Sequence, residues 1–298
     1  MNDLEWDGVM QEKITPDHQT ELPAGLGQHA ARARGSWSLR QRWSDRLKSM
    51  RLVRRPFYRA CGLRRASHAV VRHDAIPLID GRILISHEAR YLFVRVPKCA
   101  NSTILGTLAH AEQSTCLAES ASKIPKSAIK KRELARSFAR PSTLDRRLAH
   151  AVLGEYRHCM FVRNPFSRVA SGYLHKMKAG GYAQRTGLPE NLSFLGFCEH
   201  LAAGGAWGDI HWLPQVDICP VPPERLHFIG HFENLAEDLD RLLHLLYDRP
   251  SDLITRDHHA TGADQRLRDL YCRRSHELIR GLYRRDFAAF GYDAERLP

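Results

Sequence analysis

Short apolar runs alternate with longer helix-like stretches from about residue 76 to the C-terminus. The runs at 83–86, 91–96 and 226–229 are rich in branched and aromatic residues, which predicts short buried strands. Between residues 235 and 246 the leucines recur at helical spacing, which predicts an amphipathic helix. Strands that alternate with helices imply a parallel sheet with helices on both faces, so we predict an α/β fold.

Three more helices follow from the same kind of pattern. Residues 144–153 are predicted to form a helix that leads into an apolar strand at 159–162. Residues 194–201 are predicted to form a short apolar helix that a pair of glycines ends. The apolar residues of 264–290 fall mostly on one side of a helix, which predicts one continuous closing helix.

The N-terminal quarter differs from the rest of the chain. It becomes crowded with arginine, and Trp43, Leu47 and Met50 recur at helical spacing, which indicates one apolar stripe. Two interpretations stay open: a basic arm that packs on the rest of the protein, or a helix that docks on an anionic membrane. We predict a basic, partly flexible extension at 1–75 and a single main domain at 76–298.

Composition limits the compartment and the number of cores. The chain has 298 residues and 43% hydrophobic content, which is enough for one sizeable core. We find no apolar run of about 18 residues that would predict a transmembrane helix, and the polar, acidic start does not resemble a secretory signal. These features predict a cytoplasmic protein, with peripheral contact to the inner face of the membrane as an open possibility.

The charge of the chain indicates the kind of partner. The formal net charge of +12 favours anionic partners such as a nucleotide, an acidic polysaccharide or a lipid surface. No nucleic-acid motif accompanies this charge, so we do not expect nucleic acid to be a partner. Cysteine and histidine spacing gives no zinc signature, so no metal site is predicted.

One candidate anion site follows the apolar run at 159–162. This run stops at Arg163, and Pro165 then stands where a helix begins, because a proline in the first turn lacks only an N–H that would be unpaired anyway. The helix carries Arg168 and Ser171 onward. Arg163 is thus predicted to lie at the carboxyl end of a strand and beside a helix N-terminus, where anions bind readily.

A second candidate anion site follows the strand at 91–96. Here a loop with a lysine leads into an amphipathic helix, and such a loop can surround a phosphate with backbone N–H groups, hydroxyls and a point charge. The residues of this loop after its proline are Lys98, Cys99, Ala100, Asn101, Ser102 and Thr103.

Together the two motifs resemble the 5′-phosphosulfate loop and the 3′-phosphate motif of sulfotransferases, which use 3′-phosphoadenosine 5′-phosphosulfate (PAPS). The resemblance implies a P-loop-like parallel sheet and a donor site in which Arg163 and Ser171 hold the 3′-phosphate. It implies that Lys98 and the loop from Cys99 to Thr103 hold the 5′-phosphosulfate. Ala100 stands where that family commonly has glycine, which implies a slightly looser approach of the backbone to the phosphate.

Three later segments resemble carbohydrate sulfotransferases of the chondroitin 4-sulfotransferase-like group (sulfotransferase family 2). They are the His211–Gln215 segment with Cys219, the strand-to-helix turn at 228–235, and the aromatic ending at 283–292. This resemblance implies transfer of a sulfuryl group from PAPS to a hydroxyl of a carbohydrate acceptor, with release of 3′-phosphoadenosine 5′-phosphate. The acceptor would be a polysaccharide, a lipopolysaccharide or a glycolipid.

The transfer needs charge stabilisation and a base. Lys98 would stabilise the leaving phosphate, and positive side chains would replace a metal. His211 is our first candidate for the base, from its place in the family-like segment, and His150 is the alternative. We predict a structural role for Arg168, paired with an acidic residue such as Glu233.

Two other functions compete with this one. A P-loop kinase would need Gly-x-x-x-x-Gly-Lys-Ser/Thr, but the loop around Lys98 lacks glycine, and its lysine precedes the small residues. A catalytically inactive relative that binds acidic polysaccharide or lipid would suit the basic N-terminal segment. The presence of Lys98, Arg163 and Ser171 together argues against it, since a pure binder would not require that set.

Overall fold

Four strands form the central sheet of the computed structural model, which describes residues 55–61, 76–116, 138–177, 182–248 and 266–298. The order is β1 (Ile83–Ser86), β2 (Tyr91–Val94), β3 (Arg157–Val162) and β4 (Phe228–His231). Strands β2, β3 and β4 are parallel, and β1 pairs antiparallel with β2 at the edge. The predicted α/β fold with a central, mostly parallel sheet is confirmed.

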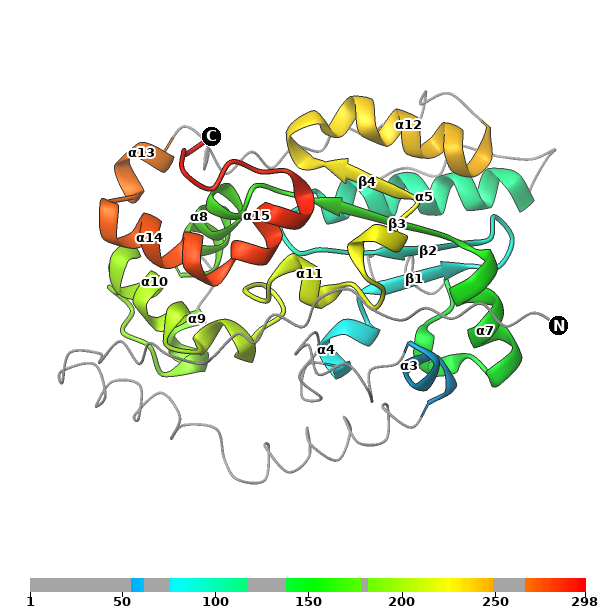
Figure 1. Cartoon of the computed structure of the whole chain (residues 1–298), viewed down its shortest axis with the longest axis horizontal. Helices are drawn as coiled ribbons and strands as arrows, with labels where there is room; N and C mark the ends of the chain where they lie inside the picture. The colour runs from blue at the N-terminus through cyan, green and yellow to red at the C-terminus, as the bar shows by residue number, and fades with distance from the viewer. Residues whose placement is uncertain (1–54, 62–75, 117–137, 178–181, 249–265) are drawn as a thin grey trace, which may run out of the picture.

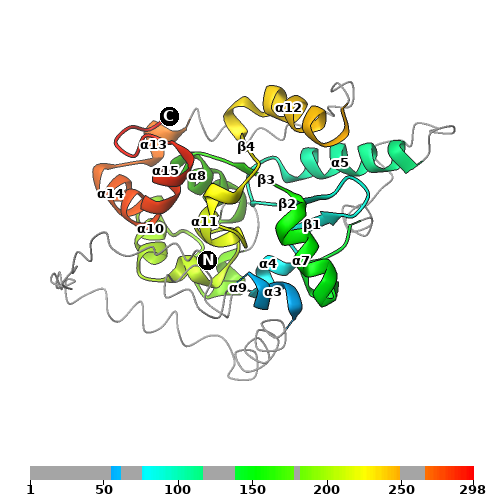
Figure 2. The same cartoon turned by 45° about the vertical axis from the view of Figure 1, so that its right-hand side comes forward.

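Helices cover both faces of this sheet (Figures 1 and 2). Helices α5 (Asn101–Cys116) and α12 (Leu235–Tyr247) lie on one face. On the other face lie α3 (Pro56–Ala60), α4 (Ile76–Asp80) and α7 (Arg146–Glu155). Because β2 and β3 are parallel, the chain crosses the sheet between them and the carboxyl ends of both strands meet at one edge.

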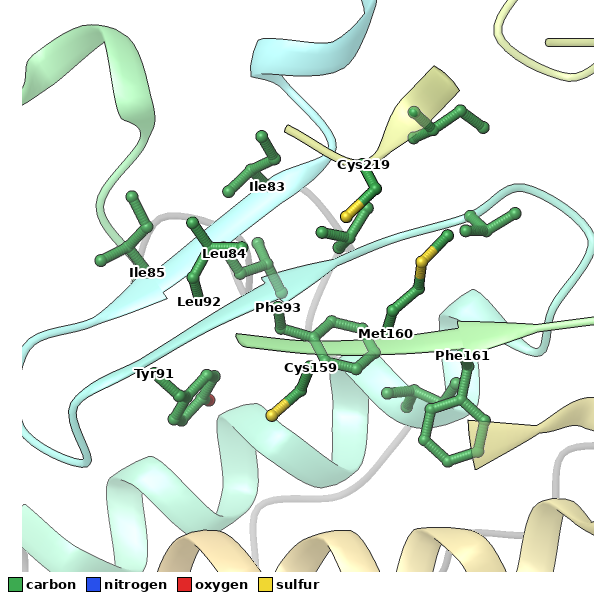
Figure 3. Packing of buried hydrophobic residues seen from close by; sticks show 14 of the residues in the cluster. Ile83, Leu84, Ile85, Tyr91, Leu92, Phe93, Cys159, Met160, Phe161 and Cys219 are labelled. Atoms are coloured by element: carbon green, nitrogen blue, oxygen red, sulfur yellow. The ribbon is translucent and has the colours of Figure 1, made fainter. Parts of the chain in front are cut away.

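The strands carry buried side chains on both faces, as a doubly covered sheet requires (Figure 3). Tyr91, Cys159 and Phe161 point toward α5 and α12, while Met160 points to the opposite face, where Cys219 lies. The aromatic rings of neighbouring strands pack directly, with 6.3 Å between the ring centroids of Phe93 and Phe161. This packing explains why the strand segments read as nearly continuous apolar runs.

A second apolar cluster surrounds α8 (Pro165–Lys176), beyond the carboxyl end of β3 (Figure 1). Its centre includes the buried rings of Phe166, Phe197 and Trp212. The helices that contribute to it are α9 (Tyr182–Thr186), α10 (Phe194–Ala202), α13 (Leu267–Leu270), α14 (Arg273–Leu282) and α15 (Arg284–Phe290). The remaining short elements are α11 (Gln215–Ile218) and 3-10 turns at Pro141–Thr143, Gly205–Gly208, Pro223–Arg225 and Phe232–Asn234.

The single closing helix predicted at 264–290 is wrong for its described part. The chain breaks between α13 and α14, where Tyr271 and Cys272 are extended, and again at Tyr283. At both breaks a tyrosine hydroxyl donates to the backbone of the α8 cluster: Tyr271 to the Phe166 carbonyl (3.0 Å) and Tyr283 to the Trp212 carbonyl (2.7 Å). These tertiary bonds outweigh the local helical periodicity.

The other predicted elements are present with small shifts at their ends. The strand predicted at 91–96 ends at Val94, and the one predicted at 226–229 begins at Phe228. Helix α7 begins after Asp145, whose carboxylate accepts a hydrogen bond from the Leu148 N–H (2.8 Å). Proline occupies the first turn of α8, as predicted.

Part of the predicted N-terminal extension, residues 55–61, is in the described structure and contains helix α3. Its Phe57 and Tyr58 are buried, and the Tyr58 hydroxyl donates to Asp80 (2.8 Å) in α4. The stripe of Trp43, Leu47 and Met50 lies outside the described residues. Within the part of the chain that is described, no helix is long and apolar enough to cross a membrane.

The close approach of α8 to the Trp212 segment generates a test. A methyl group at Gly172 would overlap the Trp212 ring, so Gly172→Ala is expected to lower the free energy of unfolding by about 1–3 kcal/mol. Gly106→Ala is the control, because its helical position has open space and the change should stabilise the protein by about 0.5–1 kcal/mol. Denaturant unfolding measures both. Equal effects of the two variants would contradict the packing described.

Candidate active site

The two predicted anion motifs meet at the carboxyl ends of β2 and β3. The loop at 95–100 follows β2, and Arg163 follows β3 directly. The Arg163 guanidinium donates from Nη1 to the Lys98 carbonyl (3.3 Å), so the two motifs are in contact. Parallel pairing of β2 with β3 brings them together although 65 residues separate them in the sequence.

The backbone of the loop around Lys98 is unusual for residues other than glycine. Lys98 has φ 71° and Ala100 has φ 49°, both in the left-handed region. The Asn101 side-chain amide donates to the Val96 carbonyl (2.8 Å) and holds the loop closed. The position where the family commonly has glycine is therefore one where glycine would relieve strain.

The remaining loop residues differ in exposure. Helix α5 begins at Asn101, so the last three residues of the predicted loop form the start of this helix. Ser102 is exposed and Thr103 is buried. The Cys99 thiol is buried within hydrogen-bonding distance of the Pro97 carbonyl (3.8 Å) and the Gln215 side chain (3.7 Å), so it faces the interior.

Lys98 lies in a strongly positive environment. Burial, followed by the charges of Arg163 and Lys176, lowers the pKa of Lys98 to about 8. An ammonium group that is destabilised in this way gains more from a bound anion than an ordinary surface lysine does. The electrostatics of the loop therefore favour an anionic ligand.

Arg163 is almost fully buried, with 4% of its surface exposed. Its guanidinium lies over the Phe232 ring, 4.0 Å from the centroid, a cation–π contact that fixes its plane. Helix α8 begins next to it, and the Asn164 side chain caps that helix by accepting from the Phe166 N–H (2.9 Å). Ser171, 2% exposed, lies further along the same helix.

Arg168 has the structural role that we predicted, but through different partners. Its guanidinium donates to the carbonyls of Pro97 (3.2 Å), Leu213 (2.9 Å) and His211 (3.1 Å). The predicted partner Glu233 instead accepts from the Asn164 N–H and the Tyr292 hydroxyl. Arg168 is 1% exposed and joins the loop before Lys98 to the segment that carries His211.

Gln215 and Asp286 complete this framework, and the sequence did not reveal their roles. The Gln215 side chain accepts from the Arg163 N–H (3.0 Å) and donates to the Arg163 carbonyl (2.8 Å). The Asp286 carboxylate accepts from the backbone N–H groups of Gln215 (2.8 Å) and Val216 (3.0 Å). Burial raises the pKa of Asp286, and these two N–H groups act against that shift. Both residues lie in segments that carried the family resemblance, which was the only available signal.

His211 forms a pair with Asp209. The His211 Nδ1 lies 2.6 Å from an Asp209 carboxylate oxygen, which also accepts from the His211 backbone N–H. The carboxylate holds the proton on Nδ1, which leaves Nε2 as a proton acceptor. Burial lowers the pKa of His211, Asp209 acts against this, and the charges of Lys176 and Arg82 add to the lowering. The ring is therefore neutral at neutral pH.

His211 lies near the loop that carries Lys98, because the Arg168 guanidinium donates to the carbonyls of both Pro97 and His211. The alternative base His150 lies elsewhere. It is exposed on α7, which leads into the start of β3, whereas Lys98 and Arg163 follow strand carboxyl ends. The structure therefore brings Lys98, Arg163 and the His211–Asp209 pair into one region.

Comparison with known proteins identifies the family of the chain. A model described as "Sulfotransferase family" matches residues 81–293. Carbohydrate sulfotransferase 8 of Homo sapiens is 28% identical over 240 residues, 71% of this chain and 53% of the human protein. Carbohydrate sulfotransferase 8 of Mus musculus is 27% identical over 69% of this chain and 52% of the relative. Carbohydrate sulfotransferase 10 of Xenopus laevis is 25% identical over 77% of this chain and 71% of the relative.

The alignment covers only part of these relatives. The chain spans about half the length of the two carbohydrate sulfotransferase 8 proteins. No solved structure matches the chain.

The prediction of a cytoplasmic protein is wrong according to these relatives. The three relatives are luminal Golgi enzymes of the type II membrane class. The prediction used the apparent lack of an anchor, but a chain that aligns with part of its relatives gives no information about segments beyond it.

The strain at Ala100 gives a stability test. Ala100→Gly is expected to raise the free energy of unfolding by up to about 1 kcal/mol, because glycine adopts the left-handed conformation without a Cβ penalty. Ala109→Gly, in the buried interior of α5, is expected to lower it by about 1 kcal/mol. Chemical denaturation compares them. Destabilisation by Ala100→Gly would show that the loop is not strained.

Arg168→Lys tests the shared framework. Lysine keeps the charge but cannot reach three carbonyls at once, so we expect a loss of at least about 2 kcal/mol in unfolding free energy. The matched control is Arg157→Lys, an exposed arginine at the start of β3, which should change stability by less than about 0.5 kcal/mol. Thermal unfolding distinguishes them, and similar melting of both variants would refute the role of Arg168.

Proposed function

The chain belongs to the sulfotransferase family, and from that premise we propose that it transfers the sulfuryl group of PAPS to a hydroxyl of a carbohydrate acceptor. The observation that carries the proposal is the contact between the two anion motifs: the Arg163 guanidinium donates to the Lys98 carbonyl. Two cationic loops joined at one sheet edge suit a nucleotide that carries charge at both its 5′ and its 3′ position.

In this proposal each motif binds one end of the donor. Lys98, with the backbone and hydroxyls of Ser102 and Thr103, binds the 5′-phosphosulfate. Arg163 binds the 3′-phosphate through its fork of donors, and Ser171 adds a hydroxyl. The framework of Arg168 and Gln215 holds the two loops at a fixed separation before the donor arrives.

The proposed chemical step is an in-line displacement at sulfur. The acceptor hydroxyl oxygen forms a bond to sulfur as the bond between sulfur and the 5′-phosphate oxygen breaks, which releases 3′-phosphoadenosine 5′-phosphate. His211 Nε2 takes the hydroxyl proton, and Asp209 stabilises the resulting imidazolium. Lys98 stabilises the negative charge that develops on the leaving phosphate.

The names of the relatives support the acceptor class that we propose. All three are named carbohydrate sulfotransferases, and we therefore propose a sugar hydroxyl in a polysaccharide, a lipopolysaccharide or a glycolipid. No group of histidine, cysteine, aspartate and glutamate in the described residues is arranged to hold a metal ion. The positive side chains of the site supply the charge that the transfer requires.

Calorimetric titration tests the donor assignment. We expect wild type to bind 3′-phosphoadenosine 5′-phosphate at micromolar concentration and ADP at least about tenfold more weakly, since ADP lacks the 3′-phosphate. Arg163→Ala should lose this preference, while Arg157→Ala, at the opposite end of β3, should keep it. Equal binding of both nucleotides by wild type, or binding of neither, would rule out the proposal.

The pH dependence of transfer tests the roles of His211 and Lys98. Because the pKa of His211 is lowered, the neutral base persists below pH 6.5 and kcat/KM falls only at lower pH. Because the pKa of Lys98 is about 8 in the free protein, kcat/KM falls as the pH rises through 8 and the ammonium is lost. Lys98→Arg should move the upper limit to higher pH. A profile without an upper limit near 8 would contradict the role of Lys98.

The same assay separates the two candidate bases. With sulfur-labelled PAPS and the best acceptor of a panel of unsulfated glycans, His211→Ala should reduce kcat by roughly 10²–10⁴-fold. His150→Ala should leave kcat nearly unchanged, because His150 is exposed on a helix that leads into the other end of β3. The reverse pattern would assign the base to His150.

A further inference from the structure

Two arginines lie opposite each other where the antiparallel pair β1–β2 reaches the active-site edge of the sheet. The register pairs Ile83 with Val94, and the next pair is Arg82 with Arg95. The Arg95 N–H donates to the Arg82 carbonyl (2.9 Å), which confirms that these residues are opposite each other. Side chains directly opposite in an antiparallel pair extend on the same face of the sheet. The two guanidinium groups are thus neighbours.

Two neighbouring guanidinium groups repel each other, which destabilises the fold unless a negative charge compensates them. Like charges directly opposite each other destabilise a strand pair. In the described part of the chain, neither side chain forms a hydrogen bond or an ion pair, and the Arg95 Nε is buried without a hydrogen-bond partner. Burial and the charges of Arg82 and Arg140 lower the pKa of Arg95 to about 10. Such a group of partly buried cations suits an anionic ligand.

The pair lies beside the candidate base. Arg82 is close enough to the Asp209–His211 pair to interact electrostatically with both residues. Arg95 is two residues before Pro97, whose carbonyl accepts a hydrogen bond from Arg168. The negative charge of Asp209 partly compensates the positive charge of Arg82, but the Asp209 carboxylate is hydrogen-bonded to His211. The loop that begins at Lys98, which we propose binds the donor, follows Arg95 along the chain. A ligand on the two arginines would therefore reach the region where the acceptor hydroxyl must lie.

We propose that Arg82 and Arg95, with the exposed Arg140 at the rim, form a subsite for an anionic group of the carbohydrate acceptor. The group is a carboxylate or a sulfate ester on a sugar next to the one that receives the sulfuryl group. Guanidinium forks bind either group through paired hydrogen bonds. The inference rests on the proposed function, and it makes an acidic glycan the preferred acceptor class.

Binding of defined oligosaccharides to the full chain tests the subsite. The probes are a chondroitin hexasaccharide, which carries only carboxylates, its carboxyl-reduced neutral form, and a sulfated keratan hexasaccharide without uronic acid. Each is titrated calorimetrically with saturating 3′-phosphoadenosine 5′-phosphate. We expect at least one acidic probe to bind about tenfold more tightly than the neutral one. The two acidic probes distinguish a carboxylate from a sulfate ester.

Variants assign that preference to the arginines. Arg95→Gln and Arg82→Gln should each weaken binding of the acidic probe about tenfold and leave the neutral probe unchanged. Arg95→Lys should keep part of the preference, because it retains charge without the fork. Arg157→Gln, which removes one positive charge at the opposite end of the sheet, should keep all of it. Melting curves check that each variant is folded.

Either of two results would overturn the subsite. One is that neither acidic probe binds wild type more tightly than the neutral probe, which needs no variant. The other is that the preference persists in the folded Gln variants. The proposed function is tested separately, because nucleotide selectivity is measured without oligosaccharide and the oligosaccharide titrations are repeated without nucleotide. Loss of nucleotide selectivity in wild type would refute the donor assignment and leave the subsite result readable.

Discussion

The buried guanidinium of Arg168 is the interaction on which the site depends. A charged group that is 1% exposed would destabilise the fold if its donors lacked partners, and here three carbonyls accept from it. One acceptor precedes Lys98, and the other two flank Trp212. The same cation therefore holds both the loop around Lys98 and the segment that carries His211. A shift of either one would disturb the other.

A parallel sheet explains why this fixation is needed. Loops that follow β2 and β3 meet at one edge, but no strand hydrogen bonds hold the loops themselves. Backbone groups there must find other partners: the Gln215 side chain bonds the N–H and the carbonyl of Arg163, and Arg168 donates to the Pro97 carbonyl. Asp286 in turn holds Gln215 in place by accepting from its backbone N–H. Lys98 and Arg163 then stay close together although burial and the repulsion from Arg163 lower the pKa of Lys98. The structure holds this unfavourable charge pair in place, which suits the polyanionic donor that we propose.

Much of this could be predicted from sequence, and the reasons are local. The strand before Arg163 and the helix after Pro165 follow from an apolar run and from the restricted φ of proline. The contacts of Arg168 could not be predicted, because its acceptors are backbone carbonyls. Every residue has a backbone carbonyl, so the residue types in the sequence do not indicate which ones accept. Asp286 lies 71 residues beyond Gln215, and only the tertiary fold joins them. The Asp209–His211 pair was missed although the two residues are close in the sequence, because the family-like segment begins at His211.

The most direct test of the account is hydrogen–deuterium exchange of the full chain with 3′-phosphoadenosine 5′-phosphate or ADP. The account predicts that the 3′-phosphorylated nucleotide slows exchange at 96–104 and 163–172 together. Exchange at residues 211–216 should slow as well, because Arg168 and Gln215 connect this segment to the two loops that follow β2 and β3. ADP should protect 163–172 much less. Equal protection by both nucleotides, or protection confined to other segments, would contradict the account.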